Sequence, residues 1–349
     1  MPSSGGQRGL NMRKFNRVLV LGAGNFGTCL AQLFAQKGFE VRMWGILQHV
    51  VEHINEAHRN PDCLSEHLLS DRISATSEVR EDIVSDVDAV ILAVPTQVLR
   101  AVLMRWKPWI TSDHLLISAA KGIENKTLSL PLSIISDVLN ENAGTATVVL
   151  SGPSFASEIM TGQPTCVSLA SHDRNSALLA QEYCHTPLFR CYTSDDPIGL
   201  ETAGALKNVV AIAAGATAGL GYQQNSRAAL MTRGLAEMTR IGSVLGANPI
   251  TFNGLGGVGD LFLTCTSTKS RNYTVGFRLG RGEKLDEIVR TVGSVAEGVT
   301  TAKAAFDLVE KFNVDAPLIR EVHAVLYEEK RIHDSIDTLL NRKPKPEIT

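Results

Sequence analysis

A single lysine stands in a long apolar stretch of this 349-residue chain. The stretch Leu200–Tyr222 predicts one long helix, and after Glu201 its only charged residue is Lys207. Positions three and four residues apart share a helix face. On that face Lys207 is in line with the small residues Ala203, Gly204 and Ala211. Burial of an unpaired ammonium is costly, so we expect a carboxylate or a ligand anion beside it. The alternative is a lysine that extends to solvent from a helix contact.

Two polar clusters follow in the second half of the chain. A glycine-rich loop, residues 254–260, ends in the carboxylate of Asp260, and Ser270, Arg271 and Asn272 begin an expected short helix. A guanidinium and the backbone N–H groups of a helix start together suit a phosphate. Singly, Asp260 and Ser270 also fit helix N-caps, and Arg271 also fits a surface charge. Together the clusters favour a site.

The motif G-x-G-x-x-G occupies residues 22–27, between an expected strand at 17–21 and an expected helix at 28–37. Its three glycines permit, in order, a tight turn, close approach of backbone to a pyrophosphate, and packing of the helix on the strand. The helix start then offers N–H groups to phosphates. This context indicates nucleotide binding, and a glycine-rich turn without a ligand is the alternative.

The end of the second expected strand, Glu40–Trp44, is uninformative about the cofactor. An NAD-selective site usually places Asp or Glu there, and an NADP site has an arginine nearby. This chain has Gly45, Ile46 and Leu47, so the choice between NAD and NADP stays open.

The order of elements predicts how these groups are brought together. Apolar runs typical of buried strands alternate with helical stretches in the first half, and long helical periods follow from about Asp195. We therefore expect an α/β fold, a Rossmann-type doubly wound sheet domain at 15–194 followed by an all-α C-terminal domain at 195–340. Flexible tails are expected at 1–14 and 341–349, with Met12 as an alternative start. Further strands are expected at 89–94, 115–118, 148–150, 166–169 and 189–192, and further helices at 228–245, 301–312 and 317–327.

Ligands of doubly wound sheets bind beyond the carboxyl ends of the strands. Three expected strand ends carry polar or turn residues, at 95–96, 121–122 and 152–154. Alone, Lys121 would be a solvated loop lysine. Glu297, before an expected helix, would be a favourable charge at a helix N-terminus.

Composition limits the partners of the chain. With 44% apolar and 20% charged residues it is typical of a globular protein, and its formal charge of −2 gives no general attraction to nucleic acid or anionic membrane. Six cysteines show no metal-ligand spacing and fit reduced thiols of a cytoplasmic protein. We expect no nucleic-acid partner, no membrane span and no metal.

These motifs resemble the bacterial NAD(P)-dependent glycerol-3-phosphate dehydrogenase family. The resemblance spans about residues 17–330 and rests on the segments 22–27, 120–124, 151–156, 204–208, 254–272 and 296–298. It implies interconversion of sn-glycerol 3-phosphate and dihydroxyacetone phosphate with NAD or NADP, which supplies glycerol 3-phosphate for phospholipid synthesis. A homodimer is the expected assembly.

The resemblance also implies roles for particular residues. Lys207 is the general acid/base, and Asp260 is the carboxylate that holds it. The implied substrate-binding residues are Lys121, Gly152, Ser154, Lys207, Asp260, Ser270, Arg271 and Asn272. The expected cofactor-binding residues are Gly22, Gly24, Asn25, Phe26, Gly27, Lys121, Ala156, Arg271, Val295 and Glu297. Many members of the family carry a basic residue where this chain has Ile46, so no contact to an adenosine phosphate is expected from that position.

Two other functions were weighed against this one. A related dehydrogenase of β-hydroxy acids would also have a helical second half and a catalytic lysine, but it would have no need of the polar array from Asp260 to Asn272. A non-catalytic nucleotide sensor would have lost Lys207 or Asp260, and both are present.

Overall fold

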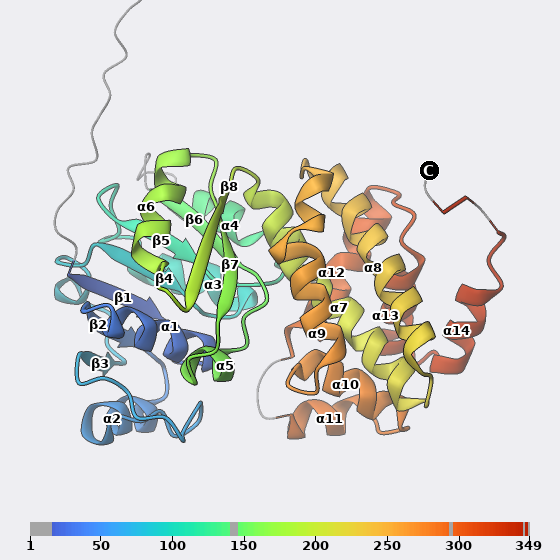
Figure 1. The fold of residues 1–349 in the computed structure, drawn as a ribbon, viewed down its shortest axis with the longest axis horizontal. Coiled ribbons are helices and arrows are strands. Elements are labelled where there is room, and N and C mark those ends of the chain that lie inside the picture. The colour runs from blue at the N-terminus through green and yellow to red at the C-terminus, as the bar shows by residue number, and fades with distance from the viewer. Residues whose placement is uncertain (1–15, 140–145, 293–295, 345, 348–349) are drawn as a thin grey trace, which may run out of the picture.

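The computed structural model describes residues 16–139, 146–292, 296–344 and 346–347. These residues form a sheet unit and a helical unit that lie side by side (Figure 1). The expected N-terminal tail, Val295 and the last two residues of the expected C-terminal tail lie outside the described residues. Among the described residues, no helix has both the length and the apolar character needed to cross a membrane.

The sheet unit is built on eight strands in the order β3-β2-β1-β4-β5-β6-β7-β8. All neighbouring pairs are parallel except β6 and β7, which are antiparallel. The strands are β1 Arg17–Leu21, β2 Glu40–Trp44, β3 Ile73–Thr76, β4 Ala89–Leu92, β5 Leu115–Ser118, β6 Ala146–Ser151, β7 Thr165–Ala170 and β8 Phe189–Ser194. The central strands are buried on both faces, as their unbroken apolar runs predict.

Helices cover both faces of this sheet. They are α1 Asn25–Gln36, α2 Gln48–Ala57, α3 Thr96–Trp106, α4 Pro131–Leu139, α5 Ala156–Met160 and α6 Arg174–Cys184. The chain order reverses between β1 and β4, and the turn after β1 opens at this point, where doubly wound sheets bind ligands.

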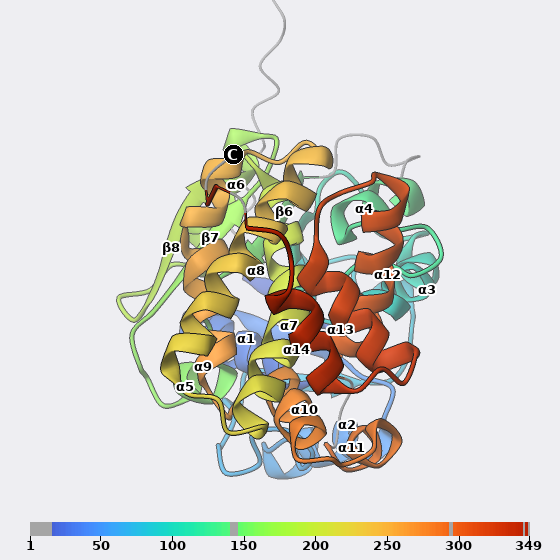
Figure 2. The same cartoon turned by 90° about the vertical axis from the view of Figure 1, so that its right-hand side faces the viewer.

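The helical unit is arranged around α7 Pro197–Gly219, which is buried along nearly its whole length. Asp196 begins this helix by accepting a hydrogen bond from the N–H of Gly199 at 2.9 Å, and Pro197 occupies the first turn. The surrounding helices are α8 Gln224–Val244, α9 Asp260–Thr266, α10 Arg271–Gly280, α11 Leu285–Thr291, α12 Glu297–Lys311, α13 Pro317–Tyr327 and α14 Ile332–Leu340. Figure 2 shows α14 on the outer face of this unit, away from the sheet.

Glycines let α10 cross α7 at very short range. A Cβ on Gly276 would lie 1.9 Å from the carbonyl oxygen of Ile212, and a Cβ on Gly215 would lie 2.0 Å from that of Tyr273. No larger residue fits at either place, so this crossing fixes where the N-terminus of α10 lies relative to Lys207 on α7.

The expected elements are present with shifted ends. The strand expected at 89–94 ends at Leu92, and the helix expected to start at Thr28 begins at Asn25. Strand β3 was not predicted. In that strand only Ile73 is fully buried, so it has no apolar run to mark it.

Candidate active site

The Asp260 carboxylate joins two lysines from different units of the fold. Its Oδ1 accepts a hydrogen bond from Lys207 Nζ and its Oδ2 one from Lys121 Nζ, each at 2.8 Å. The Lys207 side chain is 8% exposed, the Asp260 side chain 2% and the Lys121 side chain 17%. The carboxylate expected beside Lys207 is therefore present, and Lys121 is no solvated loop lysine.

Thr264 also contacts the Lys207 ammonium. Its Oγ1 accepts a hydrogen bond from Lys207 Nζ at 2.8 Å and donates one to the backbone oxygen of Asp260 at 2.6 Å. Asp260 is the first residue of α9, and Thr264 lies four residues later, so one helical turn presents both groups to the ammonium. Asp260 does not cap this helix with its side chain, so the N-cap alternative for this residue is wrong.

Burial and neighbouring charges shift the pKa values of Lys207 and Asp260. Burial lowers the pKa of the Lys207 ammonium, Asp260 opposes this effect, Lys121 reinforces it, and the net direction is downward. For Asp260, burial would raise the pKa, but the Lys121 and Lys207 charges outweigh it and hold the pKa below its usual range. The site thus pairs an ionised carboxylate with an ammonium that gives up its proton more readily than an exposed lysine.

The small residues beside Lys207 leave room for the second lysine. A Cβ on Gly204 would lie 3.7 Å from Cγ of Lys121 and 3.0 Å from Oγ of Ser151. The aliphatic part of Lys121 therefore passes over α7 at Gly204. Lys121 itself follows strand β5, so this close passage lets a group from the sheet unit reach Asp260 in the helical unit.

The N-terminus of α10 lies next to this pair. Ser270 caps the helix by accepting a hydrogen bond from the N–H of Tyr273 at 3.2 Å, so the N-cap interpretation of this residue is confirmed. Asn272 is buried, and its Oδ1 accepts a hydrogen bond from the N–H of Gly298 at 2.9 Å. Arg271 is the first residue of the helix and is exposed. Its guanidinium is therefore accessible to an anion at a helix start.

Glu297 belongs to the same charged cluster. It is the first residue of α12. Burial raises the pKa of its carboxyl to about 7, while the charges of Arg271, Lys121 and Lys207 act in the opposite direction. Glu297 is therefore within electrostatic range of all three cations and is more than a charge placed at a helix start.

The turn after β1 fits a dinucleotide. Gly22 has φ +121°, a conformation that glycine adopts readily, and a Cβ on Gly27 would lie 1.9 Å from the Gly22 oxygen. Nothing lies within 4 Å of where a Cβ of Gly24 would be, and no side chain caps α1 there. The first N–H groups of α1, at Asn25 and Phe26, thus open into free space that a pyrophosphate can occupy.

The loop after β6 carries three further residues that were expected at the site. Gly152 has φ +148°, and a Cβ there would lie 2.9 Å from Cα of Val167. Ser154 Oγ donates a hydrogen bond to the Gly152 oxygen at 2.9 Å, which shapes the loop. Ala156 follows as the first residue of α5.

Three residues for which the sequence predicted no role shape the site. Thr264 holds Lys207, and Ser151 lies buried at Gly204. Asn60, also buried, donates from Nδ2 to the Ala23 oxygen and to Thr28 Oγ1, each at 2.9 Å, and so fastens the glycine turn. Ser151 and Thr264 lie within the motif segments 151–156 and 254–272, which could have marked them, whereas Asn60 lies in a loop that gives no sequence signal of such a contact.

Comparison with known proteins agrees with this geometry. A family model for the N-terminus of NAD-dependent glycerol-3-phosphate dehydrogenase matches residues 17–177, and one for its C-terminus matches residues 196–337. Glycerol-3-phosphate dehydrogenase [NAD(P)+] of Staphylococcus haemolyticus is 42% identical over 331 residues, which cover 95% of this chain and 99% of that protein.

Solved structures agree as well. A glycerol-3-phosphate dehydrogenase from Coxiella burnetii superposes with a TM-score of 0.89 at 34% identity, covering 94% of this chain and 99% of that one. The Plasmodium falciparum enzyme does so with a TM-score of 0.85 at 25% identity, covering 95% and 97%. These relatives support the dehydrogenase of glycerol 3-phosphate over the two other functions considered. The chain belongs to the NAD-dependent glycerol-3-phosphate dehydrogenase family.

Proposed function

We propose that this chain interconverts dihydroxyacetone phosphate and sn-glycerol 3-phosphate, with Lys207 as the general acid/base and Asp260 as the group that orients it. The observation that carries the proposal is the buried Lys121–Asp260–Lys207 arrangement, with N–O distances of 2.8 Å on both sides. It places an acid of lowered pKa beside an anion-binding helix start.

In the direction of reduction, a reduced nicotinamide held at the glycine turn would supply the hydride that C2 of the ketone accepts. Negative charge then grows on the C2 oxygen, and the Lys207 ammonium stabilises this charge and donates a proton to it. Lys207 regains its proton from water. Asp260 and Thr264 hold Nζ in place throughout, so the proton is delivered from a fixed position.

The substrate phosphate is placed at the start of α10. Arg271 and the backbone N–H groups at the start of that helix provide the charge and the donors that a phosphate requires. Ser270 and Asn272 shape the helix start, and Ser154 shapes the loop after β6 that carries Gly152. Such positioning contributes several kcal/mol to lowering the barrier.

The glycine turn holds the dinucleotide with Gly22, Gly24, Asn25, Phe26 and Gly27. Lys121, Ala156, Glu297 and the guanidinium of Arg271 complete the proposed set among the described residues. Val295 stays an expectation from the resemblance. Both NAD and NADP occur in the names of the relatives.

Oxidation of NADH and of NADPH, each with dihydroxyacetone phosphate and with a 3-oxo acid, tests the activity. We expect turnover with the triose phosphate alone. Lys207→Ala should lose most of kcat and still bind NADH, as measured by its fluorescence. Turnover of the 3-oxo acid in place of the triose phosphate, or cofactor binding without turnover in the wild type, would contradict the proposed reaction. A Lys207→Ala variant with near-native kcat would contradict the role of Lys207 alone.

We further propose that the enzyme is a cytoplasmic homodimer, with its sheet and helical domains meeting after Ser194. Six free cysteines fit a reducing compartment. The gap between β8, which ends at Ser194, and α7, which begins at Pro197, supports the boundary. Sedimentation equilibrium of the purified chain tests the dimer.

A further inference from the structure

A cavity lies in the helical unit, lined by residues of α7, α8, α13 and α14 and of the C-terminal segment 342–347. It has a volume of about 590 Å³, within the range of sites that hold small molecules. None of its lining residues belongs to the active site described above. The cavity is therefore separate from that site.

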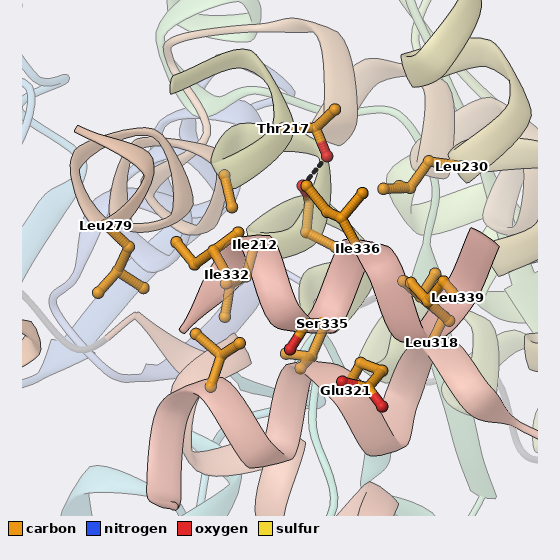
Figure 3. A pocket seen from close by; sticks show the side chains of 14 residues that line it. Ile212, Thr217, Leu230, Leu279, Leu318, Glu321, Ile332, Ser335, Ile336 and Leu339 are labelled. Carbon is orange, nitrogen blue, oxygen red and sulfur yellow. Dashed lines mark hydrogen bonds between the residues drawn. The ribbon is translucent and has the colours of Figure 1, made fainter. Parts of the chain in front are cut away.

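The body of this cavity is apolar. Leu230, Leu318, Ile336 and Leu339 line it, and the same four residues also line an adjoining smaller cavity of about 50 Å³. Figure 3 shows that smaller cavity, which is lined mostly by hydrocarbon side chains and also by Thr217, Glu321 and Ser335. Apolar cavities hold water poorly, because water there finds no polar partners. They suit a hydrocarbon chain.

One face of α8 adds charge to the mouth of the cavity. Ala229, Arg233, Glu237 and Arg240 recur at spacings of four and three residues, so they share that face. Glu237 is turned inward, where its two carboxylate oxygens accept hydrogen bonds from the N–H groups that begin α13 at 2.8 and 3.0 Å. Burial raises the pKa of this carboxyl to about 7, and the charge of Arg240 acts in the opposite direction.

The cations of the mouth differ in how far they are already engaged. Arg240 donates to the backbone oxygen of Asp315, and Arg342 pairs with the carboxylate of Asp315, each at 2.8 Å. In the part of the chain that the structure describes, Arg233 has no hydrogen bond or ion pair, and it is exposed. The guanidinium of Arg233 is thus available at the edge of the apolar cavity. A single carboxylate matches it in charge and geometry.

We propose that this cavity binds an aliphatic carboxylate, with the acid head on Arg233 and the hydrocarbon chain between α8 and α14. The unpaired arginine selects the charge of the ligand, and the leucine-rich interior selects its chain. Lys343 and Glu347, which also line the cavity, bring one charge of each sign to its C-terminal side.

Isothermal titration of the full-length enzyme at pH 8 tests this, with decanoate as the probe and decyltrimethylammonium as the oppositely charged probe of equal chain length. We expect saturable binding of decanoate and none of the cation. Arg233→Ala should weaken decanoate binding about tenfold. Ala229→Phe, at an exposed position, should abolish it by filling the mouth. Arg174→Ala, an exposed arginine on α6, is the matched control and should bind like the wild type.

Dehydrogenase activity of each variant confirms that it is folded. The proposal is overturned if decanoate shows no saturable binding, if both probes bind alike, or if neither Arg233→Ala nor Ala229→Phe changes the affinity. It is also overturned if decanoate fails to bind while Ala229→Phe turns a dimer into a monomer in sedimentation, since the face would then be an interface between two copies.

Discussion

The two oxygens of the Asp260 carboxylate are each held by a lysine, one from the sheet unit and one from the helical unit. The negative charge of Asp260 raises the pKa of Lys207, so Asp260→Asn lowers that pKa further. Reduction requires a protonated Lys207, so activity falls as pH rises through that pKa. We therefore expect the alkaline limb of the pH profile of kcat/KM for ketone reduction to move to lower pH, with kcat reduced about a hundredfold.

Asp286→Asn provides the control for this profile, because Asp286 is an exposed acid on α11. It should leave both limbs where they are in the wild type. An Asp260→Asn enzyme with an unmoved alkaline limb would mean that Asp260 does not set the protonation of Lys207.

Ile46 bears on the choice of cofactor. Its side chain is 74% exposed just beyond β2, where dinucleotide sites recognise the ribose. Ile46→Arg places a cation where a 2′-phosphate would lie, so kcat/KM for NADPH should rise about tenfold relative to that for NADH. Leu178→Arg, at an exposed apolar position on α6, should not change this ratio. Equal ratios in the two variants would exclude a role of position 46.

Sequence alone indicated part of this site. The lone charge of Lys207 in an apolar helix predicted a nearby anion, since a buried ammonium needs one. The partner on the other side, Lys121, lies 139 residues before Asp260 in the chain. Its ordinary loop context gave no reason to bring it there. Before the structure was known, only the resemblance to a family predicted that Lys121, Lys207 and Asp260 lie in one site.

At the scale of elements, the crossing of α7 and α10 determines where the proposed phosphate site at the start of α10 lies relative to Lys207. Gly276→Ala puts a Cβ 1.9 Å from the Ile212 oxygen, and the helices must separate. We expect a loss of at least about 3 kcal/mol of unfolding free energy and a higher KM for dihydroxyacetone phosphate, because Arg271 moves with α10.

Thermal melts and steady-state kinetics check this expectation. Thr274→Ala, on the same helix and half-buried, removes only a hydrogen bond to the Thr268 oxygen and should cost about 1 kcal/mol. Were Gly276→Ala as stable as Thr274→Ala, the close crossing would not be a constraint on the site.

Long periodic elements were predictable, and short ones were not. The apolar runs that form β1 and β5 and the 23-residue α7 carry strong patterns. Strand β3 owes its existence to pairing with β2 rather than to its own residues. The antiparallel placement of β7 beside β6 likewise depends on contacts between segments, which no local pattern encodes.

At the scale of the whole molecule, Glu201 links the two units. It lies on α7, and its Oε1 accepts a hydrogen bond from the N–H of Leu132 on α4 at 2.8 Å, while Oε2 has no partner in the described structure. Burial raises the pKa of this carboxyl from 4.5 to about 8. The folded state therefore keeps a proton that the unfolded chain loses. The resulting stability is complete below pH 4.5 and is lost as pH rises through 8.

Glu201→Gln removes this dependence. Between pH 6 and pH 8 the wild type should lose roughly 2 kcal/mol more unfolding free energy than the variant, as measured by urea denaturation. The interval from pH 7 to 8 is the most specific, because the other buried carboxyls with a raised pKa, Glu237 and Glu297, reach only about 7. Glu182→Gln, at an exposed position, should show the same pH dependence as the wild type. If the unfolding free energy of Glu201→Gln changed with pH as that of the wild type does, Glu201 would not be the source of this pH dependence.

The contact between Lys121 and Asp260 has a consequence for how such enzymes can be recombined. A chimera that takes its first half from this chain and its second half from a distant relative inherits a cation that requires an acid at one exact place in the other half. Exchanging halves is thus permitted only between sequences that keep both members. Whether two halves of different origin form an active enzyme thus depends on the charges of Lys121 and Asp260.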